Sequence, residues 1–115
     1  TDGTPLETLA HPQSRRVMSA ENVALLRKML QRVVEEGTAQ DAAWLEEGAG
    51  GKTGTAQTGQ FTPDGTERKN LWFAGFYPAQ QPRYTIVVLQ DGQVSTEHSS
   101  AAIFARLCAM LDLLA

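Results

Sequence analysis

Residues 50–57 read Gly-Gly-Lys-Thr-Gly-Thr-Ala-Gln, and this stretch decides how the chain on both sides of it is interpreted. Its threonines are β-branched and favour a strand. A Gly-Lys-Thr sequence also ends the phosphate-binding loop of nucleotide-binding proteins, but that loop needs an earlier glycine at a fixed spacing and a helix directly after it. The earlier position is Glu46 here, and Gly54 and Pro63 oppose a helix. A phosphate-binding loop, and with it nucleotide binding, is therefore only a remote alternative.

Upstream of this stretch, the sequence predicts a helix over about residues 20–36. Ser19 is a suitable N-cap, because its hydroxyl can accept from a free backbone N–H of the first turn. Gly37 follows at the position where many helices end on a left-handed residue. The apolar residues recur at helical spacing and predict one buried face. They are Val23, Leu26, Met29, Leu30, Val33 and Val34.

Downstream, turn signals divide the chain into strands over Lys52–Gln57, Leu71–Tyr77 and Tyr84–Leu89. Pro63-Asp64-Gly65 separates the first two strands, and Gln80-Gln81-Pro82 separates the last two. Short turns join antiparallel neighbours, so a three-stranded meander is expected. The continuous Ile86-Val87-Val88-Leu89 run suggests that the third strand is buried on both faces.

A second helix is predicted from about residue 100 to residue 114, with one apolar stripe that covers a face of the sheet. The single cysteine, Cys108, lies on this stripe and is expected to be a small buried hydrophobe rather than a nucleophile. The predicted fold class is therefore α+β. A three-stranded antiparallel sheet is flanked by an upstream helix and a C-terminal helix.

Composition limits the possible functions. The 115 residues include 10 Lys+Arg and 13 Asp+Glu, which give a net charge of −3, and 42% are apolar. This size fits one domain or a piece of one, and the mild acidity argues against nucleic-acid binding. No signal peptide or membrane-spanning apolar run is present, so no direct membrane contact is expected from this segment. No His/Cys cluster has metal-ligand spacing, and neither a metal nor a cofactor is predicted.

The order of these elements resembles the transpeptidase domain of penicillin-binding proteins. The active-site strand of that family is matched by Gly51-Lys52-Thr53-Gly54-Thr55-Ala56-Gln57. The helix that precedes this strand is followed by Gly37-Thr38-Ala39, and the next strand of the family resembles Trp72–Pro78. The Ala-Gln ending is similar to that of the monofunctional, class B members. The resemblance implies a β-lactamase-like fold, in which residues 1–115 form the C-terminal part of a single, incomplete domain.

Two of the three catalytic motifs of the family are absent from this sequence. The family uses Ser-x-x-Lys for its nucleophile and a neighbouring Ser-x-Asn. None of the five serines here has Lys three places on or Asn two places on. These serines are Ser14, Ser19, Ser95, Ser99 and Ser100. The chain is therefore expected to supply the Lys-Thr-Gly strand but not the nucleophile, and to be inactive alone.

The resemblance implies a role for each residue of the motif. Lys52 would place an ammonium beside the reacting groups, and Thr53 and Thr55 would donate to the terminal carboxylate of the substrate. Residues two apart on a strand face the same side, which suits this shared task. Gly54 would allow close packing behind the strand. The backbone N–H of Thr55 would be one oxyanion-hole donor.

The activity implied for the parent protein is peptidoglycan D,D-transpeptidation through a serine acyl-enzyme. The implied partners are stem peptides ending in D-Ala-D-Ala, β-lactams and the remainder of the transpeptidase domain. The implied location is the extracytoplasmic face of the bacterial cell membrane, with a membrane anchor outside this segment. A β-lactam sensor of the same fold is the alternative function. On the strand after the motif, Trp72 and Phe73 alternate in direction, so one could line the cleft while the other fills the core, and a core position is the default expectation for both.

Overall fold

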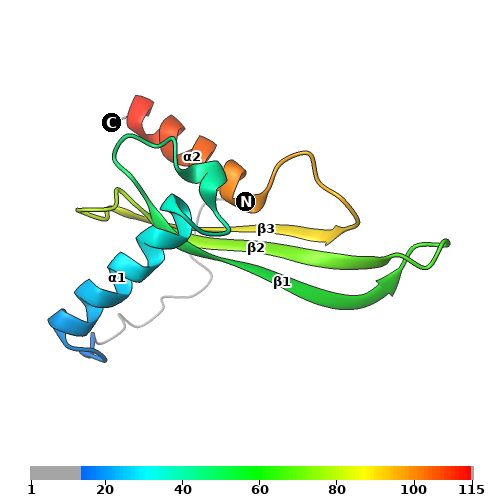
Figure 1. Cartoon of the computed structure of the whole chain (residues 1–115), viewed down its shortest axis with the longest axis horizontal. Helices are drawn as coiled ribbons and strands as arrows, with labels where there is room; N and C mark the ends of the chain where they lie inside the picture. Colours follow the sequence, from blue (N-terminus) through cyan, green and yellow to red (C-terminus); the bar gives the residue numbers. More distant parts are fainter. Residues whose placement is uncertain (1–13, 115) are drawn as a thin grey trace, which may run out of the picture.

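The computed structural model describes residues 14–114 and contains a three-stranded antiparallel sheet with a helix on either side of it in the chain (Figure 1). The strand order is β1-β2-β3. The elements are α1 (Ala20–Glu35), the short 3₁₀ helix η1 (Gln40–Ala42), β1 (Gly50–Phe61), β2 (Glu67–Tyr77), β3 (Tyr84–Gln93) and α2 (Ser100–Leu114). The predicted α+β fold class is confirmed, and each strand is longer than predicted.

Both predicted turns join neighbouring strands. In the β1–β2 turn, Gly65 has a φ of +87°, and the backbone N–H of Thr66 donates to the Thr62 hydroxyl at 3.1 Å. The same N–H donates to the Asp64 carboxylate, and the Thr62 hydroxyl donates to it as well. These donors, with the Thr62 hydroxyl first, hold the pKa of Asp64 below its usual value. In the β2–β3 turn, the N–H of Arg83 donates to the carbonyl of Tyr77 at 2.9 Å.

The core lies between the sheet and α2, which crosses one face of the sheet in Figure 1. Phe73 of β2 and Phe104 of α2 meet edge to face, with ring centroids 4.8 Å apart. The Phe73 ring fits because its neighbours on the strands are glycines. A Cβ atom on Gly51 would lie 2.4 Å from this ring, and one on Gly75 would lie 2.6 Å from it. Cys108 is fully buried in the same core, as predicted.

The opposite face of the sheet carries apolar side chains that no other element covers within residues 14–114. Trp72 is 39% exposed, Val87 58% and Leu89 44%. Two expectations are therefore wrong for this chain. Phe73 lies in the core, but Trp72 does not, because successive strand residues point to opposite faces and no described element covers Trp72 on its side of the sheet. The Ile86–Leu89 run is not buried on both faces, for the same reason.

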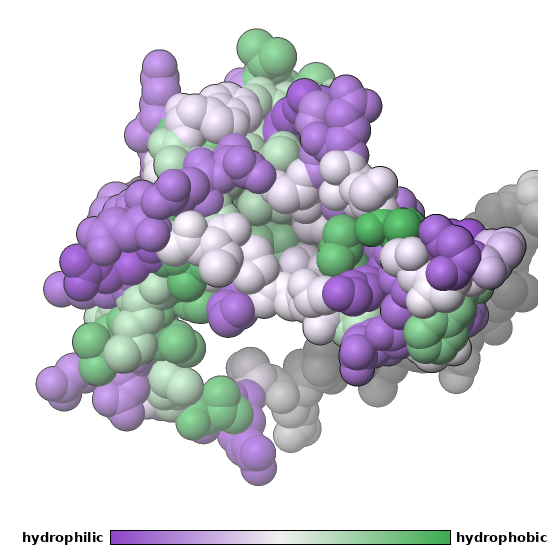
Figure 2. All heavy atoms as spheres, turned by 45° about the vertical axis from the view of Figure 1, so that its right-hand side comes forward, coloured by the Kyte–Doolittle hydropathy of each residue, from purple (hydrophilic) through white to green (hydrophobic). Residues whose placement is uncertain are grey.

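Helix α1 forms as predicted, and Ser19 caps it by accepting from the N–H of Asn22 at 3.2 Å. The expected buried face is present only at the end of α1, where Val34 is buried and Val33 packs against the core, whereas Met29 is 58% exposed. Figure 2 shows hydrophobic side chains at the surface on the lower left limb, where α1 and the residues before it lie. Gly37 does not adopt a left-handed conformation. It is needed there because a Cβ atom would lie 2.9 Å from the carbonyl oxygen of Val33.

Side-chain donors attach α1 to the turn after β2. The guanidinium of Arg27 donates to the carbonyl of Ala79 at 2.8 Å and to that of Gln80 at 2.6 Å. The amide of Gln31 also donates to the Ala79 carbonyl, at 3.0 Å. The guanidinium lies over the ring of Phe76, 5.9 Å from its centroid. Polar contacts to backbone carbonyls, rather than burial of an apolar stripe, therefore hold much of this helix in place.

Candidate functional site

A cavity of about 320 Å³ lies between β1, β2 and the beginning of α2, and the predicted motif lines it. Strand β1 is at the edge of the sheet, and within residues 14–114 no strand pairs with its outer side. Alternate residues of such an edge present free N–H and C=O groups. The lining residues are Thr38, Thr53, Gly54, Thr55, Leu71, Trp72, Thr96, Ser99, Ser100 and Ala101. The walls are therefore mostly hydroxyl groups and small side chains.

Thr53 and Thr55 lie in this cavity together. Thr53 pairs with Phe73 and Thr55 with Leu71 across the β1–β2 register. Directly opposite residues of an antiparallel pair share a face, so both threonines are on the side of the sheet that α2 covers. Their hydroxyls can donate to one acceptor group in the cavity, and such a pair of donors suits a carboxylate.

Lys52 lies on the other face of β1, since it pairs with Ala74. Its side chain is exposed, and Nζ donates to the backbone carbonyl of the next residue, Thr53, at 2.8 Å. The ammonium is thus beside the free edge of β1, one residue from the cavity. The structure brings a positive charge and two hydroxyl donors to the same part of this edge.

Gly54 lines the cavity but is not packed tightly from behind. A Cβ atom there would lie 3.4 Å from the Cβ of Trp72, which is an ordinary van der Waals contact. The expectation that Gly54 permits close packing behind the strand is therefore wrong within the described residues. The glycines that do permit it are Gly50, Gly51 and Gly75, where an added Cβ would meet ring atoms at 2.3–2.6 Å. At these three positions a phenylalanine ring occupies the space.

The cavity also contains a residue to which the sequence assigned no role. The Thr38 hydroxyl, just after α1, lies 2.8 Å from the Thr53 hydroxyl. Three residues on, the Asp41 carboxylate accepts from Ser99 at 2.5 Å, and the Ser99 hydroxyl caps α2 by accepting from the N–H of Ala102. The partners are 15 and 58 residues apart in the chain. No local pattern could reveal these contacts, although Thr38 does belong to the Gly-Thr pair that follows the helix.

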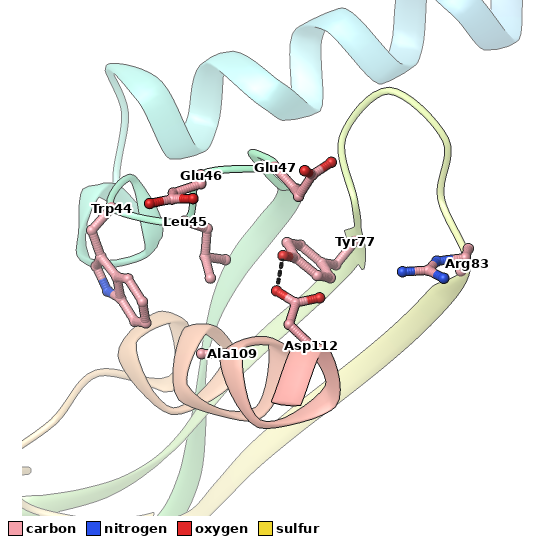
Figure 3. Close-up of a pocket in the computed structure, with 8 residues that line it drawn as sticks. All are labelled: Trp44, Leu45, Glu46, Glu47, Tyr77, Arg83, Ala109 and Asp112. Carbon is pink, nitrogen blue, oxygen red and sulfur yellow. Dashed lines mark hydrogen bonds between the residues drawn. The ribbon is translucent and has the colours of Figure 1, made fainter. Parts of the chain in front are cut away.

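A second cavity, of about 550 Å³, lies between the loop before β1, the end of β2 and the last turns of α2 (Figure 3). The Tyr77 hydroxyl donates to the Asp112 carboxylate there, which ties the end of β2 to the last turns of α2. Burial, and then this carboxylate, raises the pKa of Tyr77 above its usual value. Trp44 is exposed at this cavity, and none of the motif residues reaches it.

Residues 14–114 hold no group of three or more His, Cys, Asp or Glu side chains arranged to bind a metal ion. In the same part of the chain, no helix has the length and apolar character that a membrane span requires. The polar groups in or beside the motif cavity are hydroxyls, backbone amides and the Lys52 ammonium.

Comparison with known families places the chain as a whole. The family model described as the penicillin binding protein transpeptidase domain matches residues 5–109. The chain belongs to this family. The resemblance expected from the Lys-Thr-Gly strand and its flanking elements is thus confirmed for nearly the whole length of the transpeptidase segment. The remote alternative is wrong, because β1 continues as a strand through the motif, whereas a phosphate-binding loop must open a helix there.

Relatives of this transpeptidase segment carry names of the same family. Penicillin-binding protein PbpB of Mycolicibacterium smegmatis is 38% identical over 101 residues, which cover 78% of this chain and 15% of the relative. A peptidoglycan D,D-transpeptidase FtsI homolog of Chlorokybus atmophyticus is 37% identical over 82 residues, and these are 69% of this chain and 12% of that protein. Stage V sporulation protein D of Bacillus subtilis is 36% identical over 71% of this chain and 13% of its own length.

A solved structure has the same fold. The crystal structure of penicillin binding protein 3 from Mycobacterium tuberculosis, complexed with ampicillin, superimposes with a TM-score of 0.72 and 30% identity. The match covers 94% of this chain and 27% of the solved chain. The transpeptidase segment therefore spans about a quarter of that chain, and about one-seventh of the curated relatives that it matches.

Proposed function

We propose that this chain is the Lys-Thr-Gly segment of a peptidoglycan D,D-transpeptidase. Its task is to bind the peptide that ends in D-Ala-D-Ala and to hold the scissile carbonyl for a serine supplied by another part of the domain. The observation that carries the proposal is the joint position of Thr53 and Thr55 in one cavity, beside a free strand edge that also carries the Lys52 ammonium.

The free edge of β1 is suited to an extended peptide. A peptide chain can add to an exposed strand edge through its backbone, and pockets for its end groups then provide specificity. The terminal carboxylate of the stem peptide would accept from the hydroxyls of Thr53 and Thr55, and the Lys52 ammonium would stabilise its negative charge. β-Lactams carry a carboxylate in a comparable place, so the same donors would hold them.

The reaction proposed for the parent protein is acyl transfer. The serine oxygen attacks the penultimate D-Ala carbonyl, the C–N bond to the terminal D-Ala breaks, and the leaving amine takes up a proton. The amine of a second stem peptide then attacks the ester, which releases the serine and forms the cross-link. The backbone N–H of Thr55 would donate to the oxyanion that develops in both steps, and the Lys52 ammonium would favour the negative charge nearby.

The remainder of the transpeptidase domain is the partner that this proposal requires. It would supply the serine and cover the uncovered sheet face, on which Trp72, Val87 and Leu89 are exposed. The chain spans only a small share of its relatives, which leaves ample sequence in such proteins to provide that cover. We place the parent protein at the extracytoplasmic face of the bacterial membrane, where peptidoglycan is cross-linked.

The test is the variant Lys52→Ala in the intact parent protein, measured with a labelled penicillin and with a D-Ala-D-Ala peptide. Loss of a preorganised charge at the reacting centre should lower both reactions by about 10²–10³-fold. The matched control is Lys69→Ala, an exposed lysine on the neighbouring strand, which should react at the wild-type rate. A folded Lys52→Ala protein with unchanged acylation would refute the proposal. Acylation by penicillin without any turnover of the peptide, in the wild type, would indicate a sensor.

A further inference from the structure

The hydroxyl of Thr38 is held directly beside that of Thr53, although neither side chain is fixed by deep burial. The two Oγ1 atoms are 2.8 Å apart, and either of them can be the donor. Thr38 itself is placed by its neighbours in the chain. Ala39 is fully buried and its N–H donates to the carbonyl of Val33 at 3.1 Å, while Gly37 fits against the same residue without a side chain.

A threonine hydroxyl has one proton to donate and two lone pairs that accept. If Thr53 donates to Thr38, its proton is used and it can no longer donate to a ligand. If Thr38 donates to Thr53, the proton of Thr53 is free for an acceptor in the cavity. A carboxylate has only acceptor atoms, so its arrival selects the second arrangement. The result is a chain of hydrogen bonds from Thr38 to Thr53 to the carboxylate, in which each bond polarises the next.

The segment that carries Thr38 is also tied to the opposite wall of the cavity. Asp41 accepts from Ser99 at 2.5 Å, directly before α2. Thr38 thus belongs to a short connection between the motif strand and the beginning of α2. This connection limits how far the Thr38 hydroxyl can move away from Thr53.

We infer that Thr38 is a positioning residue, which directs the proton of Thr53 toward the carboxylate of the bound substrate or β-lactam. The inference rests on the proposed function, because Thr53 must itself contact that carboxylate. It predicts that Thr38 matters only for ligands that carry a free carboxylate. A residue that merely supported the fold would affect all ligands alike.

The experiment uses the intact parent protein and two ligands, a labelled penicillin and the same penicillin with its carboxylate esterified. Thr38→Val keeps the β-branched shape and removes the hydroxyl. It should lower the second-order acylation rate for the acid about five-fold, chiefly through weaker binding, and leave the rate for the ester unchanged. Thr38→Ser keeps the hydroxyl and should react with the acid at the wild-type rate. The matched control Thr85→Val, an exposed threonine on β3, should change neither rate.

The double variant Thr38→Val/Thr53→Val shows whether Thr38 acts through its hydrogen bond to Thr53 or whether the two residues act separately. If Thr38 acts through Thr53, the double variant should be no slower with the acid than Thr53→Val alone. Equal losses for the acid and the ester, or fully additive losses, would overturn the inference while Thr53 keeps its proposed role. If Thr53→Val left the reaction with the acid unchanged, the role proposed for Thr53 would fail, and the inference with it.

Discussion

Cys108 shows at the scale of a single residue how the environment decides chemistry. Its side chain is fully buried between α2 and the sheet, and Asp112 lies one turn further along the helix. Burial, and then the negative charge of Asp112, raises the pKa of the thiol to about 12. The nucleophilic form of cysteine is the thiolate, which burial and the raised pKa both disfavour in the folded chain. It is a packing residue of the core.

We expect this cysteine to resist iodoacetamide at pH 8 in the native chain and to react once the chain is unfolded. The pKa of the Cys108 thiol is raised from 9.0 to about 12 on folding. The contribution of the protonated thiol to the free energy of unfolding is therefore fully present below pH 9 and is lost as the pH rises toward 12. The free energy of unfolding should therefore fall over this range, and it should fall less steeply in Cys108→Ala. Rapid labelling of the native chain at pH 8 would contradict the burial of the thiol.

At the scale of elements, α1 shows that a helix with an exposed apolar stripe can still be firmly attached. Arg27 and Gln31 donate to backbone carbonyls of the turn after β2, and the guanidinium lies over the Phe76 ring. Charged donors to carbonyls form stronger hydrogen bonds than neutral ones. The carbonyl of Ala79 would lose its charged donor if Arg27 were replaced.

The variant Arg27→Met should lower the free energy of unfolding by about 1–3 kcal/mol, because it removes charged donors while keeping a similar helix propensity. Denaturant unfolding of the chain measures this effect. Arg106→Met on the exposed side of α2 is the matched control and should change the stability little. Equal stability of both variants would mean that the contacts of Arg27 are replaced by water without cost.

At the scale of the whole molecule, the middle of one sheet face is uncovered within residues 14–114. It exposes Trp72, Val87 and Leu89, and helix α1 exposes Met29. Large exposed apolar surfaces in a soluble chain mark places where another protein surface packs. The motif cavity lies at the edge of the sheet, where no strand within residues 14–114 pairs with the outer side of β1.

The chain alone should form no covalent adduct with penicillin, even with excess reagent. A serine becomes nucleophilic only when a base is within hydrogen-bond reach, and no serine here is followed by lysine at one helical turn. Intact-mass spectrometry after incubation measures the result. A stoichiometric mass increase on any residue of this chain would show that the chemistry has been assigned to the wrong groups.

We also expect the isolated chain to self-associate through its uncovered sheet face. Sedimentation velocity at increasing concentration should show a shift toward larger species. Val87→Thr with Leu89→Thr should reduce this shift, since threonine favours a strand and replaces an apolar side chain with a polar one. Arg106→Met serves as the control at a site away from this face. A chain that stays monomeric at all concentrations would contradict the expectation.

Local signals in the sequence are sufficient to predict the order and type of the main elements. Ser19, the helical spacing that follows it, and the turns around Gly65 and Pro82 are local signals, and each acts through the backbone of a few neighbouring residues. The Lys-Thr-Gly motif and its neighbours were also sufficient to indicate the family. Such features are predictable because the residues that cause them are adjacent in the chain.

Contacts between distant parts of the chain determine which apolar residues are buried and which groups meet in the cavity. Met29 and Val87 are apolar like the residues of the core, yet both side chains are exposed because no described element lies over them. The contact between Thr38 and Thr53 depends on how α1 ends against β1. Burial and long-range hydrogen bonds depend on what a side chain meets in space, and a pattern of neighbours along the chain does not contain that information.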